Sequence, residues 1–503
     1  MTDTLVNANA GAGEASAGDH VDVLIIGAGI SGIGAAHHLA EQRPGTSYLI
    51  LEALETFGGT WLTHTYPGIR SDSDLFTFGY RFKPWPGPPI AEAGAILDYL
   101  GEVIDEDGSA AHIRYQHRVL SASWSSAERR WTVQVHRTDT DERFTVTAGF
   151  LWMCQGYYRH ATGYTPDWDG MEDFQGTIVH PQTWPAHLDL HGKRVVVIGS
   201  GATAATLIPA IAEDVEHVTM LQRSPTFFFV RPNANELADS LRELDVPEEW
   251  THEIVRRRIL HDQAEATQLA LEYPNEAREL LLEAIRPLLP EGFDIDTHFN
   301  PSYDPWRQRI AVLPDGDLFA GIRSGKASVV TDHIDRFTEN GILLKSGEEL
   351  EADVIITATG FDLSVMGDIA FDVDGIAVDW ADRVTYRGLM FTGVPNLVYV
   401  FGYFRYSWTL RADIIADFVC RLLGHMEELG AGEVTPELRP ADLELERRPW
   451  IEATEFNPGY LQRSLHLMPK QLSESPFRLS HDYPSEKEEL VSADLDDGIL
   501  RYR

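Results

Sequence analysis

Two short glycine-rich loops constrain the fold of this chain more than any other feature. The first reads Gly27-Ala28-Gly29-Ile30-Ser31-Gly32 and the second reads Gly199-Ser200-Gly201-Ala202-Thr203-Ala204. Each follows a short, largely apolar run, residues 21–26 or 193–198, that is typical of a buried parallel strand. A strand, such a loop and a helix begin a nucleotide-binding unit. The sequence therefore predicts an α/β fold with two Rossmann-like dinucleotide-binding domains.

The first loop has the residues that contact with a dinucleotide requires. Gly27 permits a tight turn, Gly29 lets the backbone approach a pyrophosphate, and Gly32 lets the helix pack on the strand. The start of the helix, which includes Ser31, offers free N–H groups to phosphate. The next strand ends at Glu52, which follows Gly32 at the spacing of about 20 residues where an acid meets a ribose hydroxyl. The position near the start of the chain indicates FAD.

The second loop indicates a different dinucleotide. Ala204 replaces the third glycine, which is an allowed variant of the pattern. The following strand, residues 218–221, ends without an acid and leads to Arg223 and Ser224. An acid would repel a 2′-phosphate, whereas an arginine binds it with two hydrogen bonds. This unit is therefore predicted to bind NADPH rather than NADH, unless Arg223 is only a surface arginine.

The stretch between the two loops carries a resemblance to a known family. Residues 174–185 read Phe-Gln-Gly-Thr-Ile-Val-His-Pro-Gln-Thr-Trp-Pro. With the flanking loops, this stretch resembles the fingerprint of type I Baeyer-Villiger monooxygenases, at Phe174, Gly176, His180, Trp184 and Pro185. The chain is most similar to the branch that holds the mycobacterial ethionamide-activating monooxygenase, from about residue 21 to about residue 476. Taken alone, the stretch could simply shape a hinge between domains.

The resemblance implies further contacts with the two cofactors. They are Gly59, Thr60 and Trp61 at the flavin, Val119 at the adenine of FAD, Arg70 and Ser71 at NADP, and His180. It also implies two catalytic residues: Arg309 over the flavin ring, with Arg307 as a close rival, and Asp72 where flavin and nicotinamide meet. Without the resemblance, residues 70–74 would be interpreted as a solvated loop and the arginine as part of a structural ion pair.

The domains are predicted to be nested. Residues 353–361 form an apolar strand ending in Ala-Thr-Gly, which in flavoproteins with two dinucleotides marks the return to the FAD domain. The FAD-binding domain would then comprise residues 21–160 and 350–503, with the NADP-binding domain, residues 161–349, inserted in it. A helical insertion at 236–290 is expected to pack on the NADP domain, and residues 1–20 to form a disordered tail. The helix at about 408–429 is expected to point its N-terminus at the flavin.

The expected activity is that of an FAD- and NADPH-dependent Baeyer-Villiger monooxygenase. Oxygen would add to the flavin C(4a) carbon as a peroxide, which attacks a small ketone and yields an ester or lactone; sulfides or thiocarbonyls are further substrates. The alternatives are a flavin monooxygenase acting mainly on N or S atoms and, in another class, a non-catalytic NADPH-sensing flavoprotein. The Trp184-Pro185 pair favours the Baeyer-Villiger group. A disulfide reductase would need a redox cysteine pair, which Cys154 and Cys420 do not supply.

Composition excludes several other classes of protein. The net charge of −37 argues against nucleic acid or an anionic membrane as partner, since both would repel the chain. No run approaches the ~18 apolar residues of a membrane span. The first residues lack the basic start and apolar core of a signal peptide, and two distant cysteines provide no disulfide framework or metal site. A reducing cytoplasm fits this composition.

Overall fold

The structure, a computed structural model, describes residues 19–503, so most of the predicted N-terminal tail lies outside the described residues. A nine-stranded sheet forms the first lobe, in the order β20-β19-β4-β5-β6-β1-β2-β3, with β23 (Leu397–Tyr399) paired to β6. Strand β1 (His20–Ile26) begins one residue earlier than predicted and lies between β2 (Tyr48–Leu51) and β6 (Glu142–Met153), parallel to both. Its last four residues are buried, as a strand covered on both faces requires.

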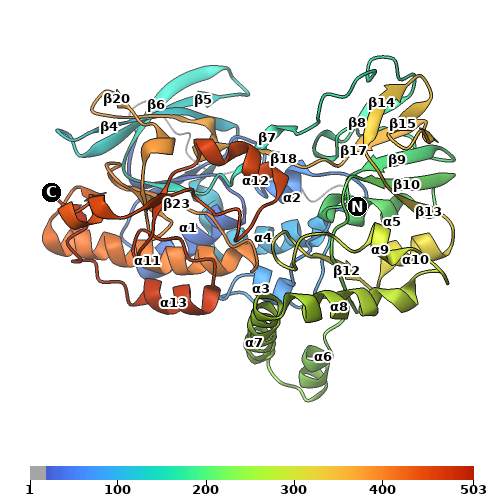
Figure 1. Cartoon of the computed structure of the whole chain (residues 1–503). Helices are drawn as coiled ribbons and strands as arrows, with labels where there is room; N and C mark the ends of the chain where they lie inside the picture. Colours follow the sequence, from blue (N-terminus) through green and yellow to red (C-terminus); the bar gives the residue numbers. More distant parts are fainter. Residues whose placement is uncertain (1–18) are drawn as a thin grey trace.

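Two long helices from opposite ends of the chain pack together beside this sheet. They are α1 (Ile30–Gln42), which follows the first glycine loop, and α11 (Trp408–Leu429). Figure 1 shows α11 running along the left lobe next to α1. The helix predicted at 408–429 is therefore confirmed at both ends, and it returns the last part of the chain to the first lobe.

Strands β4 (His117–Ser125), β5 (Arg130–Arg137) and β6 form an antiparallel part of this sheet. Apolar residues alternate along β4 and β5, and the rings of Trp124 and Trp131 meet edge to face at 5.5 Å. The last part of the chain then adds β19 (Ala370–Val373), which pairs with β4, and β20 (Ile376–Ala377). The sheet is therefore completed by strands that lie far apart in the sequence.

The second lobe is a five-stranded parallel sheet in the order β13-β10-β9-β17-β8. Its strands are β8 (Thr177–Val179), β9 (Arg194–Ile198), β10 (His217–Gln222), β13 (Ala327–Thr331) and β17 (Val354–Thr357). Val354 pairs with Val195 on one side and with Thr177 on the other. The prediction that the chain is back in the first domain from residue 350 is therefore wrong for β17, because hydrogen bonding on both sides holds this strand in the second sheet.

The two connections between the lobes lie side by side. Strand β7 (Tyr158–Gly163) carries the chain out of the first lobe, and β18 (Phe361–Leu363) carries it back. They pair antiparallel, Phe361 opposite Gly163 and Leu363 opposite Tyr158. The lobes are thus joined through one short two-stranded ribbon, visible in the middle of Figure 1.

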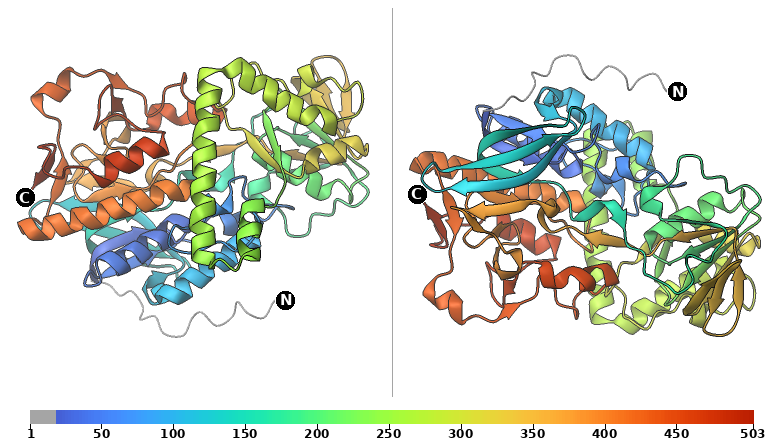
Figure 2. Two further views of the ribbon diagram at one scale, coloured as in Figure 1. Left: turned by 90° about the horizontal axis from the view of Figure 1, so that it is seen from below. Right: turned by 90° about the horizontal axis from the view of Figure 1, so that it is seen from above.

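The helical insertion consists of α6 (Glu236–Glu243), α7 (Glu248–Glu272) and α8 (Pro274–Ile285). Helix α8 packs on the second lobe as predicted, with Ile285 buried in its core. Helix α7 instead runs between the lobes (Figure 2) and packs on α3 (Leu75–Phe78) of the first. Its buried Arg256 donates to the carbonyl oxygens of Phe76, Thr77 and Gly79 at 2.9–3.2 Å. The prediction is corrected for α7, since its one buried arginine needs the acceptors at the end of α3.

The remaining elements complete both lobes and the C-terminal region. The helices are α2 (Thr60–Thr63), α4 (Ala93–Asp107), α5 (Ala202–Ile211), α9 (Ile295–His298), α10 (Asp317–Arg323), α12 (Gly459–Ser464) and α13 (Tyr483–Val491). The strands are β3 (Ile113–Arg114), β11 (Phe228–Arg231), β12 (Ala311–Pro314), β14 (Ile334–Thr338), β15 (Gly341–Leu344), β16 (Glu349–Glu351), β21 (Thr385–Tyr386), β22 (Met390–Phe391), β24 (Val434–Pro436), β25 (Arg447–Arg448), β26 (Gln471–Leu472) and β27 (Leu500–Tyr502).

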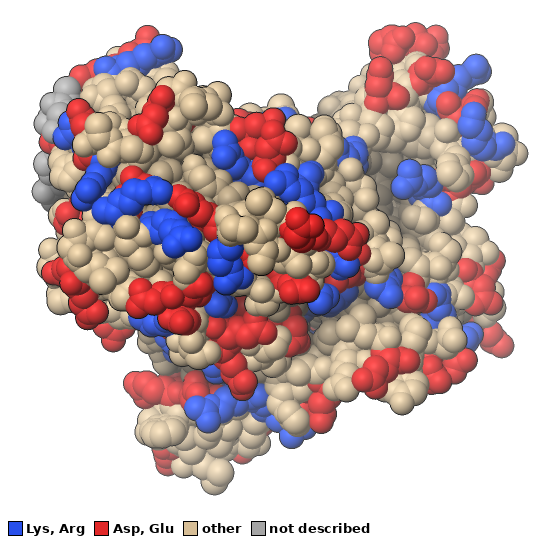
Figure 3. Space-filling view, turned by 60° about the vertical axis from the view of Figure 1, so that its left-hand side comes forward, with Lys and Arg blue, Asp and Glu red and all other residues tan. Residues whose placement is uncertain are grey.

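The surface carries its charge in scattered form. On the face drawn in Figure 3, acidic side chains are spread over the molecule with basic ones between them. The net charge of −37 is thus not gathered into a single patch on that face. Within residues 19–503, no helix is both long and apolar enough to cross a membrane.

Candidate active site

A single large cavity lies where the two glycine loops face each other. Its volume of about 1270 Å³ exceeds the 300–1,000 Å³ of a typical small-molecule site, which leaves room for more than one ligand. Most of the residues predicted to bind cofactors line it: Gly27, Gly29, Ser31, Glu52, Gly59, Thr60, Trp61, Arg70, Ser71, Asp72, Val119, Gly199, Ser200, Gly201, Ala202, Thr203, Arg223, Ser224 and Arg309. The structure therefore brings together residues from both predicted nucleotide units.

The third small residue of each glycine loop, Gly32 or Ala204, lies behind the cavity wall. A Cβ on Gly32 would lie 1.9 Å from the carbonyl oxygen of Gly27, so this glycine allows helix α1 to pack against the strand end. Ala204 is fully buried in the core of the second lobe. Both residues thus shape the loops, which is the role expected of the third position.

The first glycine loop leaves backbone N–H groups without side-chain partners where a phosphate would bind. Helix α1 starts without a side-chain cap at Gly29, so its first N–H groups are not satisfied by a side chain. Gly59 faces Gly29 so closely that a Cβ on Gly59 would lie 3.3 Å from the Cα of Gly29. Buried Glu52 accepts the N–H of Ala28 at 2.7 Å and braces the loop. Two opposed glycines at an uncapped helix start fit a pyrophosphate.

The second loop is equally open. Helix α5 begins at Gly201 without a side-chain cap, and a Cβ on Gly201 would meet nothing within 4 Å. Ser200 is held by Thr226, their hydroxyl oxygens 2.9 Å apart. Arg223 is exposed just beyond β10, and none of the ion pairs in the described part of the chain involves it. A free guanidinium at the end of this strand suits a 2′-phosphate.

The loop of residues 70–74 is tied to the other lobe by three ion pairs. They join Arg70 to Asp317 at 2.6 Å, Asp72 to Arg309 at 2.5 Å, and Asp74 to Arg231 at 2.6 Å. Alternate residues of this first-lobe loop are thus paired with oppositely charged residues of the second lobe. The partner of Arg70 belongs to α10, that of Asp72 to the segment before β12, and that of Asp74 to β11. Such pairs fix where Asp72 lies relative to the second lobe.

Arg309 meets Asp72 through a two-pronged contact. Its Nε and Nη2 donate to the two carboxylate oxygens, and Nη2 also donates to the hydroxyl of Ser73 at 3.2 Å. The side chain is 43 % exposed because it faces the cavity, although it lies deep between the lobes. Burial works to lower the pKa of Arg309, but the Asp72 carboxylate outweighs burial and raises that pKa, so the group stays cationic. The rival Arg307 is not among the cavity-lining residues.

Comparison with known proteins identifies the family. The profile of pyridine nucleotide-disulphide oxidoreductases matches residues 21–279. The FAD-containing monooxygenase EthA of Mycobacterium tuberculosis is 46 % identical over 486 residues, which cover 96 % of this chain and 98 % of the relative. The chain belongs to the FAD-containing monooxygenases. A probable FAD-binding monooxygenase, AlmA of Acinetobacter baylyi, is 42 % identical over 96 % of both chains.

Solved structures share the fold of this FAD-containing monooxygenase. A steroid monooxygenase bound to NADP matches with a TM-score of 0.74 and 23 % identity, over 96 % of this chain and 99 % of that one. A cyclohexanone monooxygenase bound to ε-caprolactone matches with a TM-score of 0.73 and 20 % identity, over 96 % and 100 %. The protein is therefore an FAD-containing enzyme whose fold is shared with an NADP-bound monooxygenase, which agrees with the two nucleotide-binding units that the glycine loops predicted. Cys154 and Cys420 are free and buried, so they form no redox disulfide.

His180 of the linker fingerprint lies outside the cavity lining. Its Nδ1 accepts the N–H of Gln182 at 3.1 Å, and its Nε2 donates to the carbonyl of Gly360 at 3.2 Å. It does not line the cavity, and a Cβ on Gly163 would collide with its ring. Burial lowers the pKa of His180, consistent with this neutral tautomer. His180 therefore fastens the linker to the ribbon between the lobes, and its contact with a cofactor stays a prediction.

Sequence reasoning missed two tyrosines in the aromatic wall of this enzyme's cavity. Tyr157 follows the short segment 154–156 after β6, Tyr158 begins β7, and both line the cavity beside Arg309. Their position just beyond the carboxyl end of a central strand was a usable signal, since ligands of such sheets bind there. The C-terminal segment, which showed no recognisable chemistry, adds Phe456, Tyr460 and Arg463 to the lining. No periodicity or motif marks those three residues.

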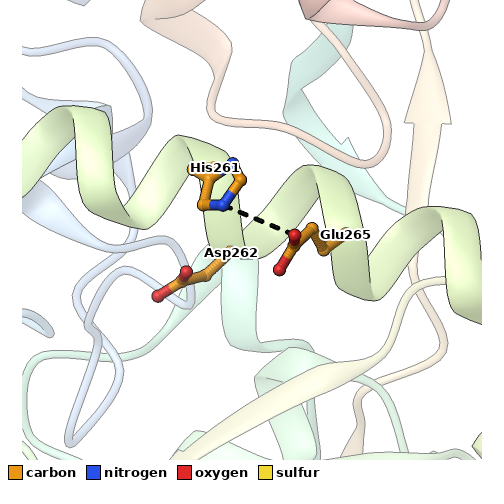
Figure 4. Close-up of side chains that lie close together, drawn as sticks. All are labelled: His261, Asp262 and Glu265. Atoms are coloured by element: carbon orange, nitrogen blue, oxygen red, sulfur yellow. Dashed lines mark ion pairs between the residues drawn. The ribbon is translucent and has the colours of Figure 1, made fainter.

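One group of side chains on α7 has the composition of a metal site. His261, Asp262 and Glu265 lie close together on the exposed side of the helix (Figure 4). Asp262 is already paired with Arg258 at 2.9 Å, and His261 with Glu265 at 3.4 Å. These are ordinary i,i+4 pairs of a solvated helix, and they support no metal assignment.

Proposed function

We propose that this enzyme inserts one oxygen atom of O2 next to the carbonyl group of a small ketone, giving an ester or lactone. One NADPH and one proton are consumed, and the second oxygen atom leaves as water. The observation that carries the proposal is the Arg309–Asp72 pair, which lies in the wall of a cavity that both glycine loops reach. Sulfides and thiocarbonyls are further substrates of the same site.

Bound FAD and NADPH supply the hydride transfer and the activation of oxygen. The chain positions the two cofactors: the uncapped starts of α1 and α5 bind phosphates, and Arg223 selects the 2′-phosphate of NADPH. Arg309 provides a fixed cation beside the place where negative charge develops on oxygen, and Asp72 holds its guanidinium in one orientation. A cation held in one orientation has little reorganisation to undergo during the reaction.

The comparison with cyclohexanone monooxygenase supports a ketone as substrate. The ε-caprolactone in that structure differs from cyclohexanone by one oxygen atom in the ring, and this chain shares the fold over nearly its whole length. We extend the proposal to domain roles: the first lobe binds FAD, and the second lobe, up to Thr357 of β17, binds NADPH. A cytoplasmic location suits an enzyme that draws on NADPH.

Isotope labelling tests the proposal. The holoenzyme is supplied with NADPH, ¹⁸O2 and an aryl ketone such as acetophenone, and the products are analysed by mass spectrometry. We expect an ester that carries one ¹⁸O atom, formed in step with NADPH consumption. Oxidation of a sulfide such as thioanisole with no ester from any ketone would instead favour an enzyme acting mainly on S or N atoms. Consumption of NADPH with hydrogen peroxide as the only product, for ketone and sulfide alike, would contradict both.

A further inference from the structure

Three tyrosine hydroxyls meet in the cavity wall of this enzyme. Tyr157 and Tyr158 are neighbours where β7 begins, and their hydroxyl oxygens are hydrogen-bonded at 2.5 Å. Tyr460 comes from α12, more than 300 residues later in the chain, and its ring lies 6.4 Å and 6.0 Å from those of Tyr157 and Tyr158. All three residues line the cavity. We call these three residues the tyrosine cluster.

The cluster can offer a hydrogen-bond donor to a ligand in the cavity. Three hydroxyls carry three hydrogens, and the Tyr157–Tyr158 bond uses one of them. Tyr460 is within hydrogen-bond reach of both other hydroxyls, so the three can bond to one another, and an acceptor in the cavity can replace one of these bonds. Burial raises the pKa of each of these tyrosines above its ordinary value of 10, so the hydroxyls stay protonated in neutral solution and remain donors.

The surroundings of the cluster favour an uncharged ligand. Arg309 lies near it and partly offsets the effect of burial on Tyr158, while Asp72 acts in the opposite sense on Tyr460. Because Arg309 and Asp72 neutralise each other through their two-pronged contact, neither sign of charge is attracted strongly. An anionic ligand would lie beside the Asp72 carboxylate, and a cationic ligand beside the Arg309 guanidinium.

The rest of this wall is aromatic. Tyr157 stacks on Trp408 at 5.3 Å with the planes 9° apart, and Tyr158 packs on Phe361 at 4.3 Å. Phe404 stacks on Phe456 at 4.6 Å, and both line the same cavity. Flat, rigid rings of this kind bind the faces and edges of apolar groups, and aromatic pairs are favourable beyond the area they bury.

We propose that the tyrosine cluster is the subsite that binds the carbonyl oxygen of the substrate, an uncharged ketone whose flat apolar body lies against the aromatic wall. The hydroxyl donates to the ketone oxygen, which places the carbonyl carbon on the side of the cavity where Arg309 lies. The inference rests on the proposed function, because it takes the ketone as the substrate of this cavity. It adds the group that recognises the ketone.

Binding to the oxidised FAD enzyme tests the subsite without any turnover. Two probes are titrated while the flavin absorbance is followed: acetophenone, which has a carbonyl oxygen, and thioanisole, in which a weakly accepting sulfur stands between the same ring and a methyl group. The variants are Tyr157→Phe, Tyr158→Phe, Tyr460→Phe and the triple substitution. Tyr502→Phe is the control, since its hydroxyl bonds to the carbonyl of Leu495 at 2.8 Å and it does not line the cavity.

A neutral hydrogen bond corresponds to a factor of about 2–12 in binding. We expect the triple variant to raise the Kd of acetophenone by at least about fivefold and that of thioanisole by less than about twofold. The single variants show the same preference if the triple variant fails to fold. An unchanged acetophenone Kd, an equal loss for both probes, or no acetophenone binding by the unmodified enzyme would overturn the subsite.

Failure of the proposed function would have a different signature. In that case the unmodified enzyme would still bind acetophenone, and the variants would still lose that binding selectively, but no ester would form when NADPH and O2 are supplied. Loss of the subsite with the function intact would show as ester formation together with tyrosine variants that bind both probes normally.

Discussion

Arg309 and Asp72 are 237 residues apart in the chain, yet they meet in one two-pronged ion pair across the gap between the lobes. The aspartate belongs to a loop of the first lobe, and the arginine immediately precedes β12 of the second. The proposed catalytic cation, Arg309, is therefore positioned only when the two lobes are correctly placed. Its orientation depends on the neighbouring pairs that hold residues 70–74.

Replacing Arg309 should separate cofactor reduction from oxygen transfer. We expect Arg309→Ala to bind FAD and to accept hydride from NADPH, but to form about 10²–10³-fold less ester and to release hydrogen peroxide, because removal of one electrostatic stabiliser costs about that much. Arg309→Lys should recover only part of the loss, since an ammonium cannot replace the planar fork. The measurement is the ratio of ester to NADPH consumed. Arg307→Ala is the matched control, and a normal ratio in Arg309→Ala would contradict the assignment.

Arg223 should determine the choice of coenzyme. A charge-assisted hydrogen bond contributes about 1.5–3 kcal/mol, and about 1.4 kcal/mol corresponds to a factor of ten. Arg223→Ala should thus raise the KM for NADPH by about 10–100-fold and leave the KM for NADH nearly unchanged. Steady-state kinetics with both coenzymes measure this. Arg257→Ala, which removes an exposed arginine paired to Glu253 on α7, should change neither value. If Arg223→Ala keeps its preference, Ser224 and Arg70 are the next candidates.

Breaking the Asp74–Arg231 pair should destabilise the enzyme. The carboxylate of Asp74 is 7 % exposed, and Arg231→Ala would leave it without its cation. Loss of one partner of a fully buried pair costs about 3–5 kcal/mol, so we expect about 2 kcal/mol for this partly exposed arginine. Chemical unfolding of the FAD-bound enzyme measures the change. Arg286→Ala breaks an exposed pair with Glu283 and should cost under about 1 kcal/mol. Equal losses of stability in the two variants would contradict a stabilising role of the Asp74–Arg231 pair.

His252 should make the enzyme sensitive to mild acid. Burial, helped by Arg256, lowers its pKa to about 4, whereas an unfolded chain has the ordinary value of 6.5. As the pH falls below about 6.5, His252 becomes protonated in the unfolded chain but stays neutral in the folded enzyme until about pH 4. The free energy of unfolding therefore decreases across this window. At pH 5 the loss is about 2 kcal/mol. His252→Gln, which keeps an acceptor for the N–H of Trp85, should lose less thermal stability between pH 7 and pH 5. An identical loss in both proteins would refute this.

The parts of the fold that could be predicted are those encoded within a few dozen consecutive residues. The sequence spacing of Gly27, Gly32 and Glu52 is set by the lengths of one strand, one helix and a second strand. The pattern can therefore be recognised without knowledge of tertiary contacts. The same holds for α11, whose apolar stripe runs over a long uninterrupted segment. The second coenzyme followed from a single local feature, the arginine after β10.

The remaining features depend on contacts between distant segments. Strand β17 would have the same local sequence pattern in either sheet. Only its pairing with Val195 and Thr177 shows that it belongs to the second sheet. The partners of residues 70–74 are likewise far away in the chain, so Asp72 could be assigned only by resemblance. Tyr460 lies in a segment without periodicity, and its place beside Tyr157 follows from packing that no short motif encodes.

The position of β17 also sets an order in which the parts of this protein become available during synthesis. The second sheet needs nothing beyond Thr357, since its last strand completes the pairing of both β8 and β9. The first sheet still lacks β19, β20 and β23 at that moment, and α1 still lacks its companion α11. The second lobe can therefore fold on the ribosome before the first lobe is complete, since the first lobe needs strands and a helix from the last part of the chain.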